Sequence, residues 1–92
     1  MWAIVEARDA VKVIDKLPRQ VAEKYALWCA IVRQSGPQGL RAIKPFRDEK
    51  LSGKLANRRS SRLSEQWRVI YHVEADAVTV YVERVTPHDY RP

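Results

Sequence analysis

The chain has 92 residues, enough for one domain and too few for two, so we treat residues 1–92 as a single domain. Its 17 lysines and arginines exceed its 11 acids, giving a formal net charge of +6, and its single cysteine excludes an internal disulfide and a cysteine-based zinc site. No stretch approaches the roughly 18 apolar residues of a membrane span and the N-terminus does not resemble a signal peptide, so we expect a cytoplasmic protein.

The first 35 residues predict a strand followed by two helices. Residues 2–6 are apolar and β-prone, which is typical of a strand. Asp9 is a candidate cap for a helix over residues 10–17, whose apolar positions follow helical spacing. Pro18 ends this helix and opens a second one over residues 19–34, so the two form a hairpin with almost no loop. The buried face of the second helix includes Cys29, which we interpret as core packing.

The second half of the chain predicts three strands after an irregular basic segment. Residues 36–57 are broken by glycines and prolines and carry no clear period. Strands are expected near 58–63, 67–73 and 78–83, with a tight turn at 74–77. The order β-α-α-β-β-β predicts an α+β fold, in which the N-terminal helical hairpin packs on one face of a mostly antiparallel four-stranded sheet. The other face is left without an element to cover it.

Strand alternation then predicts which side chains share that other face. If Trp67, Val69, Tyr71 and Val73 point toward the helices, Arg68 and His72 point away from them. If Leu63 also points toward the helices, Arg58 and Arg62 join Arg68 on the face opposite the helices. A shift of register by one residue would reverse this assignment.

The positive charge is concentrated in the middle third of the chain. Residues 41–70 carry nine lysines and arginines against three acids, so this third alone has a charge of +6. Such a patch attracts polyanions, of which nucleic acid is the leading candidate, although a plain solvated surface is the alternative. The candidate RNA-binding cations are Lys44, Lys50, Lys54, Arg58 and Arg59.

Sequence motifs for other chemistries are missing. The chain has no Walker loop, no G-x-G-x-x-G, no H-E-x-x-H and no C-x-x-C, and only two histidines. We therefore expect neither a metal nor a cofactor. The C-terminal run His88-Asp89-Tyr90 follows directly after the last strand and is either a titratable site or a disordered end.

These features together resemble the RelE/ParE superfamily of bacterial type II toxins, and most closely its RelE and HigB branches. The resemblance rests on the order and spacing of Leu51-Ser52-Gly53, Arg59-Ser60-Ser61-Arg62-Leu63, Trp67-Arg68-Val69-Ile70-Tyr71 and His88-Asp89-Tyr90. It extends over essentially the whole chain. The sequence departs from the RelE pattern at Ser60, where that strand has a second cation, and from the HigB pattern near Glu49 and Ser52, where a histidine and a lysine are expected.

The resemblance implies a toxin that enters the ribosomal A site, cleaves mRNA without a metal, and is neutralised by a cognate antitoxin protein. The residues that match the functional positions are Arg62, Arg68, Asp89 and Tyr90, with His88 as a further acid or base. In such a reaction the 2′-hydroxyl of the RNA attacks the adjacent phosphate and leaves a 2′,3′-cyclic phosphate, which is why RNA is favoured over DNA.

Two other functions fit the same sequence. A ParE-type toxin would share the fold but inhibit DNA gyrase, and a basic module without catalytic activity would only bind RNA or a partner. The antitoxin would be received either at an exposed sheet edge or by apolar residues of the helical hairpin such as Leu27 and Ile31.

Overall fold

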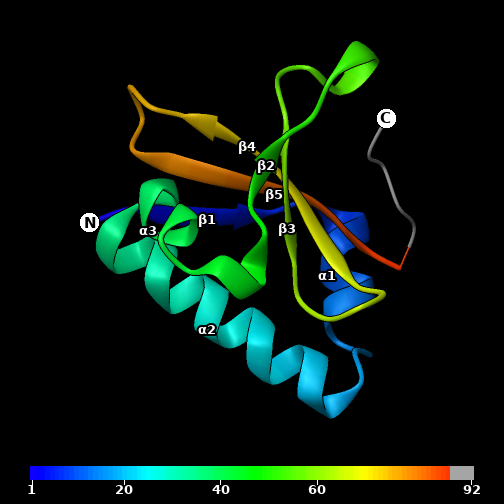
Figure 1. The fold of residues 1–92 in the computed structure, drawn as a ribbon. Coiled ribbons are helices and arrows are strands. Elements are labelled where there is room, and N and C mark those ends of the chain that lie inside the picture. The colour runs from blue at the N-terminus through cyan, green and yellow to red at the C-terminus, as the bar shows by residue number, and fades with distance from the viewer. Residues whose placement is uncertain (88–92) are drawn as a thin grey trace.

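The computed structural model describes residues 1–87, which form one five-stranded sheet with helices packed against it (Figure 1). Two short 3-10 turns, at Lys44–Phe46 and Gly53–Leu55, lie on either side of β2. The helices and strands, in chain order, are β1 (Ala3–Glu6), α1 (Arg8–Ile14), α2 (Arg19–Ser35), α3 (Pro37–Arg41), β2 (Glu49–Lys50), β3 (Arg59–Arg62), β4 (Arg68–Glu74) and β5 (Thr79–Thr86).

The sheet has the strand order β1-β5-β4-β3-β2, and every pairing is antiparallel except that of β1 with β5. The α+β class and the mostly antiparallel sheet are therefore confirmed. The expected number of four strands is wrong by one, because Glu49 and Lys50 pair with Ser60 and Arg59 to form the short β2. A two-residue strand is too short to leave a period in the sequence.

Both helices of the predicted hairpin are present, but residues 15–18 join them, and α1 packs mainly on β5 and not on α2. The first helix begins at Arg8 with Ala7 at its N-cap, so the expected cap at Asp9 is wrong. Asp9 instead lies in the first turn, where its negative charge faces the positive end of the helix dipole. The break at residues 35–37 is also confirmed, but Pro37 opens a further helix, α3, within the segment that was expected to be irregular.

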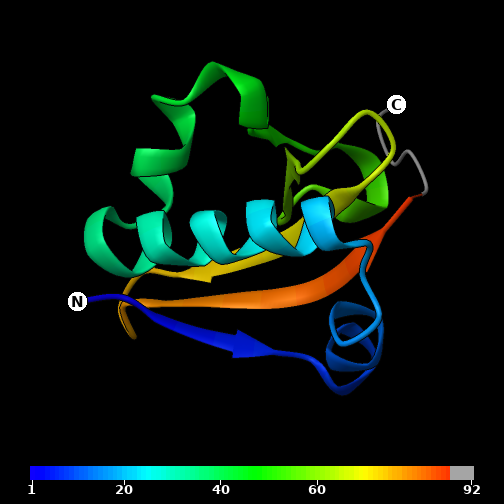
Figure 2. The same cartoon turned by 90° about the horizontal axis from the view of Figure 1, so that it is seen from below.

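The core lies between the sheet and α2, which crosses one face of it (Figure 2). Trp28 is fully buried; its ring stacks on that of Tyr25 at 5.8 Å and meets the ring of Tyr71 edge-on at 5.3 Å. Cys29 belongs to the same cluster, and burial raises the pKa of its thiol, so its interpretation as a core residue is confirmed. We call the sheet surface turned away from α2 the far face.

No helix within residues 1–87 is both long and apolar enough to cross a lipid bilayer. The longest is α2, with 17 residues. Its mixed composition follows from its position, since one side packs in the core and the other carries exposed charges such as Arg19 and Glu23.

Candidate active site

The register of the sheet brings two of the predicted arginines together on the far face. Val69 and Tyr71 of β4 are fully buried in the core cluster, so the alternating residues Arg68 and Ile70 point the other way. Arg62 of β3 lies directly opposite Arg68 of β4, and paired residues of adjacent strands point to the same face. The alternation therefore predicted this pair correctly, and Leu63 packs in the core as expected.

These two arginines line a small depression of about 130 Å³ that we call the arginine pocket; its residues are Arg47, Glu49, Ser60, Arg62 and Arg68. Glu49 pairs with Ser60 across β2 and β3, which brings its side chain to the far face beside the arginines. Three guanidinium groups thus surround one carboxylate, the single acid among the described residues that line the pocket. Such a pocket attracts a phosphate and also offers a group that can accept a proton.

Arg68 is buried rather than extended to water, with only 5% of its surface exposed. Its Nη1 donates a hydrogen bond to the backbone oxygen of Gln66 at 3.2 Å. Ile70 and Ser60 on the same face are each only 3% exposed, so the far face is not the bare surface that was expected. A guanidinium held at the floor of a pocket keeps a fixed orientation, which favours a positioned charge over a mobile one.

A buried polar cluster centred on Asp48 lies on the opposite face of β3 and β4 from the arginine pocket. We call it the Asp48 cluster; it contains Asp48, Arg59, Ser61 and Tyr71. The carboxylate of Asp48 accepts hydrogen bonds from Arg59 Nε at 2.7 Å, from Ser61 Oγ at 2.7 Å and from the Tyr71 hydroxyl. Its side chain is fully buried. Three donors from two strands therefore fix one loop residue.

Burial and the charges of the Asp48 cluster shift two pKa values. Burial and the negative charge of Asp48 raise the pKa of the Tyr71 hydroxyl, so it stays protonated and acts as a donor. Burial alone would lower the pKa of Arg59, but the hydrogen bond and charge of Asp48 outweigh it and raise that pKa. The guanidinium of Arg59 is therefore held in an ion pair with Asp48.

The Asp48 cluster also explains how a two-residue strand is held in place. Arg47 has a left-handed backbone (φ 45°) at the end of the first 3-10 turn, which turns the chain into β2. Asp48 is anchored in the interior, while its neighbours Arg47 and Glu49 both line the arginine pocket. The anchor thus fixes the two residues on either side of it.

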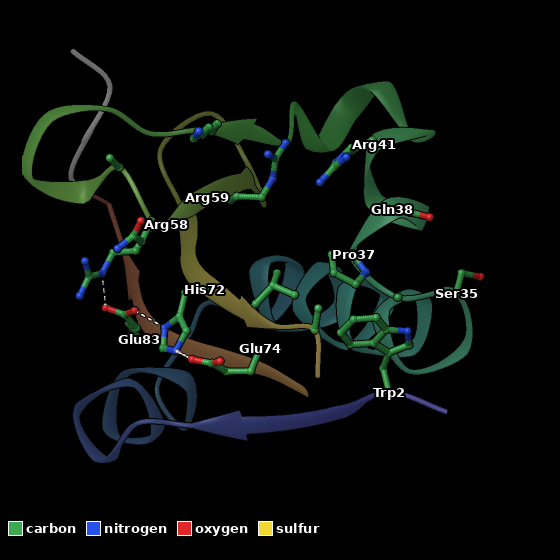
Figure 3. Close-up of a pocket in the computed structure, with 16 residues that line it drawn as sticks. Trp2, Ser35, Pro37, Gln38, Arg41, Arg58, Arg59, His72, Glu74 and Glu83 are labelled. Carbon is green, nitrogen blue, oxygen red and sulfur yellow. Dashed lines mark hydrogen bonds and ion pairs between the residues drawn. The ribbon is translucent and has the colours of Figure 1, made fainter. Parts of the chain in front are cut away.

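A second polar group lies farther along the far face, at the C-terminal end of β4. Arg58 Nε donates to Glu83 at 2.6 Å, and Nδ1 of His72 contacts the other oxygen of the same carboxylate (Figure 3). Burial of Glu83 favours its neutral form, but the hydrogen bonds from Arg58 and His72 outweigh this effect and lower its pKa. Arg58 is therefore paired, and it lies at the opposite end of β3 from Arg62.

The structure separates the predicted RNA-binding cations into two groups. Lys50, Arg58 and Arg59 line a large cleft at the edge of the sheet, beside β4. Lys44, on the first 3-10 turn, and Lys54, on the second, are exposed and line neither this cleft nor the arginine pocket. The predicted residues His88, Asp89 and Tyr90 lie outside the described residues.

Sequence reasoning missed Arg47 and Glu49 as pocket residues. Both belong to a segment without periodicity, and their position depends on the pairing of β2 with β3. The adjacent Arg47-Asp48-Glu49 run was the only available signal, since it places two acids within the most basic part of the chain. Within residues 1–87 no three histidine, cysteine, aspartate or glutamate side chains gather as they would around a metal ion.

The two candidate surfaces for an antitoxin differ in exposure. Leu27 is 47% exposed on α2 and lines a mostly apolar groove of about 850 Å³ together with Pro18, Val21 and Trp67. Ile31 packs against the core and is not among the residues that line the groove. The sheet ends in β1 on one side and in the short β2 on the other.

Comparison with known proteins identifies solved structures with the same fold, but no family model and no curated protein that matches the sequence. A YoeB/ParE toxin from Agrobacterium tumefaciens superposes with a TM-score of 0.78 at 18% identity, over 95% of this chain and 99% of the other.

Two further solved structures match over nearly their whole length. YafQ from E. coli has a TM-score of 0.74 at 15% identity, over 94% of this chain and 92% of the other. The RelE of an archaeal RelE–RelB complex from Pyrococcus horikoshii has a TM-score of 0.73 at 20% identity, over 94% and 93%. The fold that the resemblance implied is confirmed, since the chain has the fold of RelE/ParE-type toxins. Identities this low establish the fold alone.

Proposed function

We propose that this chain, which has the RelE/ParE fold, is the toxin of a type II toxin–antitoxin system and acts as an mRNA endoribonuclease. The observation that carries the proposal is the pairing of Arg62 with Arg68 on adjacent strands, with Glu49 beside them in the arginine pocket. The pocket has the groups that an RNA phosphate and its 2′-hydroxyl require.

In the proposed reaction the 2′-oxygen forms a bond to the adjacent phosphorus while the bond from phosphorus to the 5′-oxygen breaks. Glu49 takes the proton of the 2′-hydroxyl, because it is the one described carboxylate in the pocket. Arg62 and Arg68 stabilise the negative charge that develops on the phosphorane oxygens. A second group returns a proton to the leaving 5′-oxygen, and the products are a 2′,3′-cyclic phosphate and a 5′-hydroxyl.

The proposed proton donor comes from the C-terminal run. Tyr90, His88 and Asp89 follow β5, whose Thr86 lies opposite Arg68 in the sheet. The chain therefore leaves the sheet next to the arginine pocket. The position of Thr86 supports our proposal that these three residues take part in the reaction, with the ribosomal A site supplying the context that the resemblance implies.

An antitoxin protein is the proposed partner. The archaeal structure with this fold is a RelE–RelB complex, and a Staphylococcus aureus structure is a YoeB–YefM complex. A cell that produces a protein whose activity stops translation needs such a partner to survive.

The test is primer extension on mRNA from cells that express the protein, with and without ongoing translation. The wild-type chain is expected to halt growth and to leave discrete mRNA ends that depend on translation. Glu49→Gln is expected to lower cleavage by about 10²- to 10⁴-fold and Arg68→Ala by about 10²- to 10³-fold, as for the loss of a positioned base or a charge stabiliser.

The controls separate loss of chemistry from loss of fold. Glu49 is exposed, so Glu49→Gln should fold normally, whereas Arg68 is buried, so Arg68→Lys is the milder companion of Arg68→Ala. Arg19→Ala, at an exposed site on α2, serves as the matched control and should remain toxic. Growth arrest with intact mRNA and a DNA-damage response would reject the nuclease in favour of gyrase inhibition.

A further inference from the structure

A large cleft, which we call the edge cleft, opens where β3 stops short of the end of β4. The pairing of these strands ends at Arg59 and Tyr71, whereas β4 continues to Glu74. The last residues of β4 therefore have no strand beside them on that side, and the gap is bordered by α3 and by residues 56–59. The resulting cleft has a volume of about 910 Å³ (Figure 3).

Two aromatic groups line the edge cleft on different sides. His72 stands on the far face with its ring stacked on that of Tyr81, at 4.9 Å between centroids and 10° between planes. Oε2 of Glu83 contacts Nδ1 of the His72 ring, and Oε1 of Glu74 lies 3.6 Å from Nε2 of the same ring. Trp2 lies toward α3, with its indole close to the backbone of Gly36 (Figure 3). The ring orientations are therefore set before any ligand arrives.

The cations of the edge cleft are not equivalent. Arg58 is paired with Glu83, and Arg59 with Asp48. Arg41 of α3 and Lys50 of β2 are exposed and form no ion pair with any acid of residues 1–87. These two side chains therefore remain available for an anionic ligand, and Figure 3 shows Arg41 directed toward the cleft.

The edge cleft and the arginine pocket share no lining residue within residues 1–87, and the ribbon of β2 and β3 separates them, because successive residues of a strand point to opposite faces. Lys50 lines the cleft while its neighbour Glu49 lines the pocket, and the same division holds for Arg59 and Ser60. His72 is four residues from Arg68 on β4, a distance of roughly 14 Å at the usual rise of a strand. His72 and Arg68 lie on the same face of β4, so one extended strand of nucleic acid that follows β4 can reach both sites.

We propose that the edge cleft is a nucleotide subsite, which binds a base and a phosphate of the same single-stranded RNA whose cleavage we assign to the arginine pocket. The inference rests on the proposed function. The base stacks on the outer face of His72, with Trp2 on another side of the cleft, and its phosphate lies between Arg41 and Lys50, the combination that single-stranded nucleic acid requires.

The acids of the edge cleft favour RNA over an acidic peptide. Glu74 lines the cleft and its side chain is 57% exposed, so an incoming carboxylate would meet a like charge there. The amino groups of adenine, cytosine and guanine can instead donate to that carboxylate.

The experiment is an NMR titration of the full chain with a four-nucleotide single-stranded RNA made uncleavable by 2′-O-methyl groups. Stacking is expected to move the His72 imidazole and Trp2 indole signals. Removing one base from the oligonucleotide should weaken binding roughly 5- to 100-fold in the wild-type chain and much less in His72→Ala. Arg41→Ala/Lys50→Ala should weaken binding about fivefold or more and, because one phosphate contact is lost, reduce the slope of log K against log salt by about 0.7.

The matched control is Lys12→Ala/Lys16→Ala, which removes the same charge from α1 and its C-terminal side, and it should bind like the wild type apart from a small electrostatic effect. If the wild type cleaves mRNA but the oligonucleotide moves neither ring, the subsite is rejected and the proposed function stands. If the wild type neither cleaves mRNA nor binds the oligonucleotide, both fail. Displacement of these signals by a glutamate-rich peptide but not by RNA would also overturn the subsite.

Discussion

At the scale of single residues, Asp48 shows how one buried carboxylate can organise a proposed active site without a proposed role in the reaction. It accepts hydrogen bonds from Arg59, Ser61 and Tyr71 and is fully buried. Its chain neighbours Arg47 and Glu49 both line the arginine pocket. A buried charge is tolerated only when it is fully paired, so the same contacts that neutralise Asp48 also fix the loop.

The first prediction concerns this anchor. Asp48→Asn keeps the shape of the side chain but leaves Arg59 without its counter-ion, so we expect the free energy of unfolding to fall by about 3 kcal/mol. Urea denaturation monitored by circular dichroism measures the change. Asp76→Asn, at an exposed turn, is the control and should change stability by less than about 0.5 kcal/mol. Equal stability of the two variants would contradict the role of Asp48.

The second prediction concerns Glu83, whose pKa lies below the reference value of 4.5 because Arg58 and His72 bind its ionised form. A group with a lowered pKa in the folded state stabilises the protein above its unfolded pKa and loses that effect as the pH falls. Stability should therefore decline below about pH 4.5 through protonation of Glu83.

Thermal unfolding at a series of pH values tests this dependence. Glu83→Gln should be less stable than the wild type at neutral pH and should flatten the acid limb of the profile. Glu65→Gln, at an exposed site, should keep the wild-type profile. A Glu83→Gln profile parallel to that of the wild type would show that another acid is responsible.

At the scale of elements, Gly36 links α2, which packs in the core, to α3, which borders the edge cleft. Gly36 has φ +74°, and a β-carbon built there would lie 2.6 Å from Nε1 of Trp2. Gly53 also has a positive φ, +64°, but its β-carbon would meet nothing within 4 Å. The two glycines therefore share a positive φ that would strain any other residue, and they differ in how crowded an added β-carbon would be.

This difference gives the third prediction. Gly53→Ala should cost about 1–2 kcal/mol, because it adds a side chain to a left-handed residue in open space. Gly36→Ala should cost at least about 1 kcal/mol more, because Trp2 must also move. Melting temperatures give the comparison, and the fluorescence of Trp2 should change only in Gly36→Ala. Similar losses in both variants would mean that Trp2 has room to shift.

At the scale of the whole molecule, the net charge of +6 and the fold have separate consequences. Electrostatic attraction depends on phosphates, which RNA and DNA share, whereas the proposed cleavage needs a 2′-hydroxyl. Charge therefore predicts binding to both polymers, and the arginine pocket predicts a reaction with only one of them.

The fourth prediction follows from this separation. Single-stranded RNA and DNA of equal length should bind with affinities within a few-fold of each other, and both should weaken as salt rises, by about 0.7 in the log–log slope for each phosphate contacted. Fluorescence anisotropy from 50 to 200 mM salt measures this dependence. Only RNA should be cut when ribosomes are added. Binding that does not respond to salt would argue against the phosphate contacts.

Much of the fold could be read from the sequence because it depends on local patterns. The helical spacing at residues 19–34 and the alternation at 67–73 each bury one set of side chains, and the buried set fixes which residues face away. That reasoning correctly placed Arg62 and Arg68 on one face. It did not find β2, α3 or the burial of Arg68, because short elements leave no period and burial depends on what packs above a residue.

The sequence by itself determined the fold class, the order of the main elements and the concentration of cations between residues 41 and 70. Only the tertiary structure decided which cations are already neutralised, since Arg59 and Arg58 find acids 11 and 25 residues away. It also brought Glu49 beside Arg62 and Arg68. Periodicity is local, whereas ion pairs and strand neighbours join residues far apart in the chain, so they are set only when the sheet closes.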